Sequence, residues 1–202
     1  MVGLLLHAEE YRGKSQRAIW LTNKGLQTTF QRISSKEPTP TPPLFGTSEL
    51  YFKSSSAATD ALFIQEWLSL RERRGLSRPY SRLTAASYLA LFLRENAGIL
   101  PDPEPIYELG TTAYDALEKA VEPLVVIFKA LYKTAFMEGF PVKEDWLYRL
   151  NPQTLQEARV LIENPTDAPE LQDIPTPDVQ NLIQKLQLWL AHHTEFKLPA
   201  SL

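Results

Sequence analysis

The hydrophobic pattern of this 202-residue chain changes near residue 70. Up to about residue 67, short runs of β-favouring residues alternate with turn-forming residues, without the sustained i, i+3, i+4 spacing of a helix. From residue 71 onward, apolar residues recur with helical spacing. We therefore expect an α+β protein with two domains, a β-barrel over residues 1–70 and an all-α helical domain over residues 71–202.

Five runs in the first part of the chain predict strands, at residues 4–9, 16–22, 26–33, 49–53 and 61–67. The last run fits a strand or a helix by periodicity alone, and we favour a strand. Asn23-Lys24-Gly25 predicts a tight hairpin, and the prolines at positions 38, 40, 42 and 43 predict a long loop over residues 34–46. Five short antiparallel strands with one long connection favour a closed five-stranded barrel of the OB type, which binds nucleic acid on one face.

Helical spacing, together with proline and glycine punctuation, predicts five helices in the second part of the chain. We expect them at residues 80–96, 106–121, 124–138, 152–163 and 178–193. The third is apolar on more than one face, which is typical of a central core helix, whereas the last has a single apolar stripe.

The mild net charge of −3 hides two halves of opposite sign. Residues 1–94 contain 13 Lys and Arg against 7 Asp and Glu, which gives +6, whereas residues 95–202 contain 8 against 17, which gives −9. Uneven surface charge alone would also produce this split. A polyanion-binding first half is the functional interpretation.

Cations and aromatic rings fall together on the first predicted hairpins. Sequence-tolerant binding of single strands needs cations along the phosphates and rings on which bases stack. Trp20 serves either as such a ring or as barrel core, and Phe30 is better explained as core. The candidate DNA-binding residues here are Arg12, Lys14, Arg17, Trp20, Lys24 and Arg32.

A second basic cluster lies where the pattern changes from strand to helix. Arginine binds phosphate through two parallel hydrogen bonds, so a DNA-binding groove at the domain junction is one interpretation and a solvated linker is the other. The candidate DNA-binding residues of this cluster are Arg71, Arg73, Arg74, Arg78 and Arg82.

Chemistry-bearing motifs are absent from the sequence. It has no cysteine, no glycine-rich phosphate loop and no nucleophile elbow, so we expect a non-catalytic protein without a metal or other cofactor. His192 and His193 point about 100° apart on a helix, which suits a shared metal poorly. No signal peptide or membrane-spanning run is found, so we expect a cytoplasmic protein with no membrane partner.

Several segments, in order along the chain, resemble the RecO family of bacterial recombination mediators. Residues 5–15, with Tyr11-Arg12-Gly13, and residues 19–26 are similar to that family's first two strands and turns. Residues 85–93 resemble the first helix of its helical domain, and Phe136-Met137-Glu138-Gly139-Phe140-Pro141 resembles its Gly-x-x-Pro region. The chain end at residues 188–202 is also similar to the family's ending.

The resemblance implies an N-terminal OB fold and a role in DNA repair and recombination. It implies binding of single- and double-stranded DNA, strand annealing and loading of recombinase onto strands coated by single-stranded DNA-binding protein (SSB), with RecR as a partner and an association with the nucleoid. Many relatives carry a four-cysteine zinc site after the Gly-x-x-Pro region. Here residues 142–147 contain no cysteine, so we expect no zinc.

In that family the helical domain also binds the acidic, Phe-ended tail of SSB. Such a tail needs an apolar pocket beside cations, and the best-spaced candidates are Lys129, Lys133 and Phe136. Packing in the helical core is the alternative role of Phe128, Tyr132 and Phe136. The competing functions are an OB-fold adaptor that binds RNA or protein without annealing activity, and an enzyme with an acidic site in residues 144–178.

Overall fold

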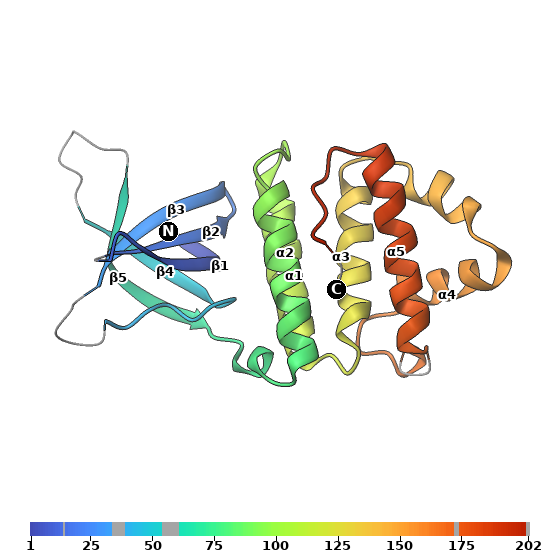
Figure 1. The fold of residues 1–202 in the computed structure, drawn as a ribbon, viewed down its shortest axis with the longest axis horizontal. Coiled ribbons are helices and arrows are strands. Elements are labelled where there is room, and N and C mark those ends of the chain that lie inside the picture. The colour runs from blue at the N-terminus through green and yellow to red at the C-terminus, as the bar shows by residue number, and fades with distance from the viewer. Residues whose placement is uncertain (14, 34–38, 54–60, 172–173, 201–202) are drawn as a thin grey trace. The chain divides into compact units, whose positions relative to one another are not determined.

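The computed structural model describes residues 1–202 apart from 14, 34–38, 54–60, 172–173 and 201–202 (Figure 1). The chain forms two compact units. Unit 1 comprises residues 1–73 and 93–111, and unit 2 comprises residues 74–92 and 112–202. Unit 1 therefore takes residues from both sides of the predicted boundary, because the segment at 93–111 packs with the strands.

The N-terminal strands close into a five-stranded barrel, as the sequence predicts. Around the barrel the order is β1-β2-β3-β5-β4, and β4 pairs back to β1. Neighbouring strands are antiparallel except β3 and β5, which are parallel at Thr29↔Leu62 and Phe30↔Phe63. The fifth run is a strand and not a helix. The strands are β1 (Val2–Tyr11), β2 (Ser15–Thr22), β3 (Gly25–Arg32), β4 (Thr47–Phe52) and β5 (Leu62–Arg71).

Alternation along the strands builds the barrel core. The inward positions include Leu5, Ala18, Leu50 and Ile64, all buried. Trp20 is completely buried among them, and its indole N–H donates to Thr29 Oγ1 at 2.9 Å. Because the polar edge of the ring has a buried partner, Trp20 is a satisfied core residue. The prediction that it offers a face for base stacking is therefore wrong, and its other predicted role, as core, is right.

The rest of the chain is helical, again as predicted (Figure 1). The first helix has the predicted bounds, and so does the fourth. Sequence periodicity missed the short turns at residues 74–77, 142–149 and 169–171, because each is too short for an apolar repeat to develop. The main helices are α1 (Tyr80–Asn96), α2 (Pro103–Lys119), α3 (Pro123–Met137), α4 (Pro152–Glu163) and α5 (Thr176–His193).

Local sequence signals explain where the helices of unit 2 begin. Pro123 and Pro152 lie in the first turns of α3 and α4, where their missing N–H groups cost little. The side chain of Glu122 caps α3 by accepting from Leu124 N, and Asn151 caps α4 by accepting from Thr154 N. Helix α3 is buried on several sides, as expected for a central helix.

A short π-helical turn, η2 (Val142–Trp146), and a 3-10 turn, η3 (Leu147–Arg149), connect α3 to α4. Val142 and Trp146 are buried, and the Trp146 ring contacts the rings of Phe128 and Tyr132 on α3 at centroid distances of 6.0 and 6.2 Å. This connection is therefore fixed to the core of unit 2. Across the described residues, every helix is too short or too polar to span a membrane.

Candidate nucleic-acid interface and partner pocket

Three aromatic rings lie in a row on the outer face of the barrel. The rings of Tyr11 on β1 and Phe30 on β3 have centroids 5.4 Å apart, and those of Phe30 and Phe63 on β5 are 5.8 Å apart. We call Tyr11, Phe30 and Phe63 the aromatic stripe. The first two rings are half-buried, and Phe63 is 37% exposed. The expectation that Phe30 belongs to the barrel core is therefore wrong, because its neighbour Thr29 is the inward residue. Their spacing is that of tilted ring pairs in mutual contact, so together they form one apolar surface.

Strand register explains why these rings share a face. Arg17 pairs with Phe30, and Phe30 pairs with Phe63, so one cross-strand row runs over β2, β3 and β5. Tyr11 lies two residues from Glu9, which pairs with Arg17 in the same row. Side chains two apart on a strand point to the same face, whereas the neighbouring positions point inward. Between Tyr11 and Phe30 the chain places the small Ser15 on β2, which leaves room for their contact.

Arginines surround the aromatic stripe. The Arg12 guanidinium lies over the Tyr11 ring, 5.0 Å from its centroid, in a turn where Arg12 and Gly13 have φ of 54° and 65°. Arg17 forms an ion pair with Glu9 at 2.7 Å, and its Nε has no hydrogen-bond partner within the described part of the chain. Arg32 is exposed at the end of β3 and pairs with Ser15. Three of the predicted cations thus border the rings, and we call Arg12, Arg17 and Arg32 the flanking arginines.

Another predicted residue, Lys24, does not lie beside the stripe. Lys24 lies exposed in the turn between β2 and β3. This turn is at the opposite end of β2 from Arg12, about 23 Å away for eight residues of strand. Lys14 lies outside the described residues.

The arginines after β5 have different surroundings. Arg73 is only 5% exposed, and its Nη1 donates to Phe45 O and to Thr47 Oγ1, both at 3.0 Å. The prediction that Arg73 contacts DNA is therefore wrong for this structure, because its guanidinium is buried and used inside unit 1. Arg71 is exposed at the end of β5.

The remaining arginines of that cluster belong to unit 2. Arg74 and Arg78 are exposed, and Arg82 donates through Nε to Ala120 O at 3.1 Å. A DNA-binding groove at the junction stays a prediction.

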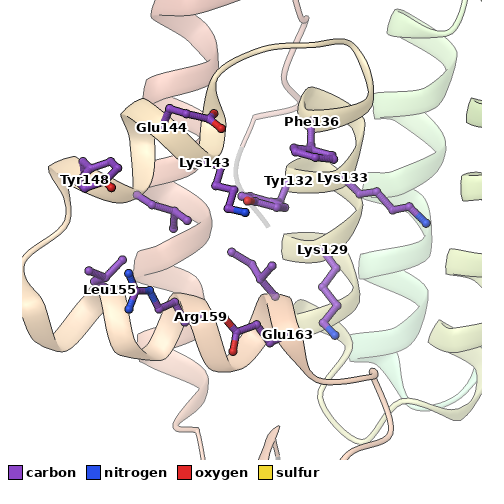
Figure 2. Close-up of a pocket in the computed structure, with 12 residues that line it drawn as sticks. Lys129, Tyr132, Lys133, Phe136, Lys143, Glu144, Tyr148, Leu155, Arg159 and Glu163 are labelled. Carbon is purple, nitrogen blue, oxygen red and sulfur yellow. The ribbon is translucent and has the colours of Figure 1, made fainter.

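Unit 2 contains a cavity of about 710 Å³ between α3, α4 and the 142–149 connection (Figure 2). All three predicted partner-binding residues, Lys129, Lys133 and Phe136, line it. Phe136 is 54% exposed, so its ring is part of an open surface and not of the helical core. The structure therefore places the three predicted residues together around one hollow. We call this cavity the cationic pocket.

Cations gather at this pocket although its surroundings are acidic. Residues 95–202 contain eight Lys and Arg, at positions 119, 129, 133, 143, 149, 159, 185 and 197. Four of these, Lys129, Lys133, Lys143 and Arg159, line the pocket beside only two carboxylates, Glu144 and Glu163. The lining therefore carries a formal charge of 4 − 2 = +2 within a half of the chain that carries −9.

The four cations are not equivalent. Lys129 donates to Asn164 O, and burial lowers its pKa from the ordinary lysine value, an effect that Asp167 partly offsets. The stem of Lys133 lines the pocket while its ammonium turns away from the centre, whereas Lys143 points inward toward Tyr132 (Figure 2). Lys143 is thus better placed than Lys129 or Lys133 to meet an anionic group, and Arg159 on α4 also lines the pocket.

Sequence reasoning missed Phe63, Lys143 and Arg159. Phe63 could have been found, because it is the position next to the inward Ile64 on a strand and so faces outward. Lys143 and Arg159 come from a short turn and a separate helix, and no local pattern brings them together.

Comparison of the chain with models of known protein families and with curated proteins finds no match. The site must therefore be interpreted from its geometry. Among the described residues, no group of three or more His, Asp or Glu side chains is placed to hold a metal ion.

Proposed function

We propose that this protein is a DNA-binding mediator of the RecO type, and that its barrel is an OB fold that binds single strands through the aromatic stripe. The observation that carries the proposal is the row of three touching rings on the outer face, bordered by three arginines. Rings supply stacking surfaces for successive bases of any sequence, and arginines neutralise the phosphates between them.

The position of the stripe supports the OB interpretation. In that fold, nucleic acid binds on the face of strands two and three, between the loops that connect strands one and two and strands four and five. Tyr11 and Arg12 lie at the β1–β2 turn, Phe30 is on β3, and Phe63 begins β5 just after the β4–β5 connection. The barrel closes through parallel pairing of β3 with β5, and this pairing places Phe30 next to Phe63.

The cationic pocket supports the second half of the proposal, which is partner binding. A peptide ending in Phe beside acidic residues would insert its ring against Tyr132, Phe136 and Leu147, and its carboxylates would meet Lys143 and Arg159. The tail of SSB has this chemistry. RecR is proposed as a further partner on the resemblance alone.

Annealing of complementary strands coated with SSB tests both halves together. We expect the protein to accelerate annealing of bare and of SSB-coated strands. An OB-fold adaptor without annealing activity would accelerate neither. Acceleration of bare strands alone would keep the DNA-binding half of the proposal and contradict the SSB half.

A further inference from the structure

One wall of the cationic pocket is made by the short 142–149 connection. Lys143, Glu144, Leu147 and Tyr148 of this segment line the pocket. The turns η2 and η3 are too short to hold their shape by backbone hydrogen bonds alone. Burial of Val142 and Trp146 fixes one side of this segment to the core of unit 2, and the contacts on its other side help to decide where Lys143 and Tyr148 lie.

Asp145, in the middle of the wall, faces α5 instead of the pocket. Its Oδ2 accepts from the indole N–H of Trp189 at 2.7 Å, and its two oxygens accept from Arg149 Nε at 2.9 Å and Nη2 at 2.8 Å. Within the described residues, the side-chain hydrogen bonds and ion pairs of the 142–149 segment all involve Asp145. The Trp189 hydrogen bond is the main cause that lowers the pKa of Asp145 below its ordinary value, and Arg149 adds to it.

His193 completes this group. Its ring stacks on Trp189 with centroids 4.5 Å apart and an interplanar angle of 10°. Nδ1 lies 2.7 Å from Trp189 O, a carbonyl that only accepts, so Nδ1 carries the proton of the neutral ring. Nε2 lies 3.8 Å from Asp145 Oδ2. The other charged group on this carboxylate is Arg149, and the adjacent His192 points elsewhere around α5.

We propose that Asp145 is a positioning residue of the cationic pocket, which holds the Lys143–Tyr148 wall against α5 through its hydrogen bond with Trp189. The part that concerns ligand binding rests on the proposed function of the pocket. The part that concerns the wall stands on the contacts alone.

Two neighbouring carboxylates make a matched test. Glu144→Gln and Asp145→Asn each remove one negative charge, one from the lining of the pocket and one from behind its wall. The probe is a synthetic acidic peptide that ends in Phe. If net charge alone determined affinity, both variants would bind the peptide more tightly. If Asp145 positions the wall, Glu144→Gln should bind the peptide more tightly, whereas Asp145→Asn should bind it about two- to thirtyfold more weakly. This range is typical of residues that affect binding without touching the ligand. Tighter or unchanged binding by Asp145→Asn would overturn the inference.

Hydrogen exchange of the free protein tests the wall without a peptide. We expect Asp145→Asn to raise amide exchange across residues 142–149 by at least about threefold, and Glu144→Gln to leave it unchanged. If the wild type failed to bind the peptide but Asp145→Asn raised this exchange, the proposed function of the pocket would fail and the positioning role would stand. Equal exchange in both variants would overturn the positioning role.

Discussion

The aromatic stripe and the cationic pocket are made of the same residue types in different geometries. Both combine aromatic rings with Arg or Lys. On the barrel, the three rings follow one another along an outward-facing sheet surface, so an extended chain of stacked bases matches them. In unit 2 the rings surround a hollow of about 710 Å³, which suits a single apolar side chain with carboxylates beside it. The two regions thus share their residue types and differ in shape, one being an outward face and the other a hollow.

Removal of the rings should produce the largest effect. We expect the triple variant Tyr11→Ala, Phe30→Ala, Phe63→Ala to bind single-stranded DNA at least about a hundredfold more weakly, because each stacked base contributes about 1–3 kcal/mol. Fluorescence anisotropy with a labelled oligothymidine measures the loss. Circular dichroism must show that the barrel remains folded. A triple variant with wild-type affinity would remove the stripe from the interface.

A change in the cationic pocket should affect peptide binding and leave DNA binding unchanged. Phe136→Ala truncates an exposed ring at the pocket, and we expect it to weaken binding of the acidic, Phe-ended peptide by about tenfold. Calorimetry measures this change, and the oligothymidine affinity of the same variant should stay within about twofold of the wild type. If Phe136→Ala lost DNA affinity while the ring triple variant kept it, the two regions would have to exchange roles.

The flanking arginines should control the salt dependence of DNA binding. We expect the double variant Arg12→Gln, Arg32→Gln to reduce the slope of log K against log salt by about 1.4, or about 0.7 for each lost phosphate contact on a single strand. Lys24→Gln is the matched control, since it removes one exposed cation at the far end of β2. If each lost cation reduced the slope equally in the arginine variant and in Lys24→Gln, the net charge of the protein, and not the flanking arginines, would explain the salt dependence.

The smallest expected effect comes from the Glu9–Arg17 ion pair. Glu9→Gln releases Arg17 and removes a negative charge next to the phosphate path. An exposed pair of this kind contributes about 0.2–1 kcal/mol, so we expect DNA affinity to rise by about two- to threefold. Anisotropy at low salt is the appropriate measurement, and a lower affinity would show that Glu9 orients Arg17 productively.

Much of the fold could be predicted from the sequence because it depends on local patterns. Alternation in strands and the 3.6-residue period in helices predicted the closed five-stranded barrel and the five main helices. The roles of individual residues were harder to predict. Trp20 and Phe30 both lie on strands beside cations, and only the observed register shows that one faces the core and the other the outer surface.

The same limit applies to the arginines and to the pocket. Arg73 looks like its exposed neighbours in the sequence, but it is buried by backbone and hydroxyl acceptors that lie 26 to 28 residues away. Lys129, Lys133 and Phe136 could be grouped because one helix carries them. Their partners Lys143 and Arg159 come from other elements, and tertiary packing alone brings them to the pocket.

Photo-crosslinking tests most directly whether the aromatic stripe is the surface that binds single strands. An oligonucleotide with 5-iododeoxyuridine at each position would be irradiated with the wild-type protein, and the modified residues identified by mass spectrometry. We predict crosslinks at Tyr11, Phe30 or Phe63. Crosslinks confined to unit 2, or none under conditions where the oligonucleotide is bound, would contradict the account.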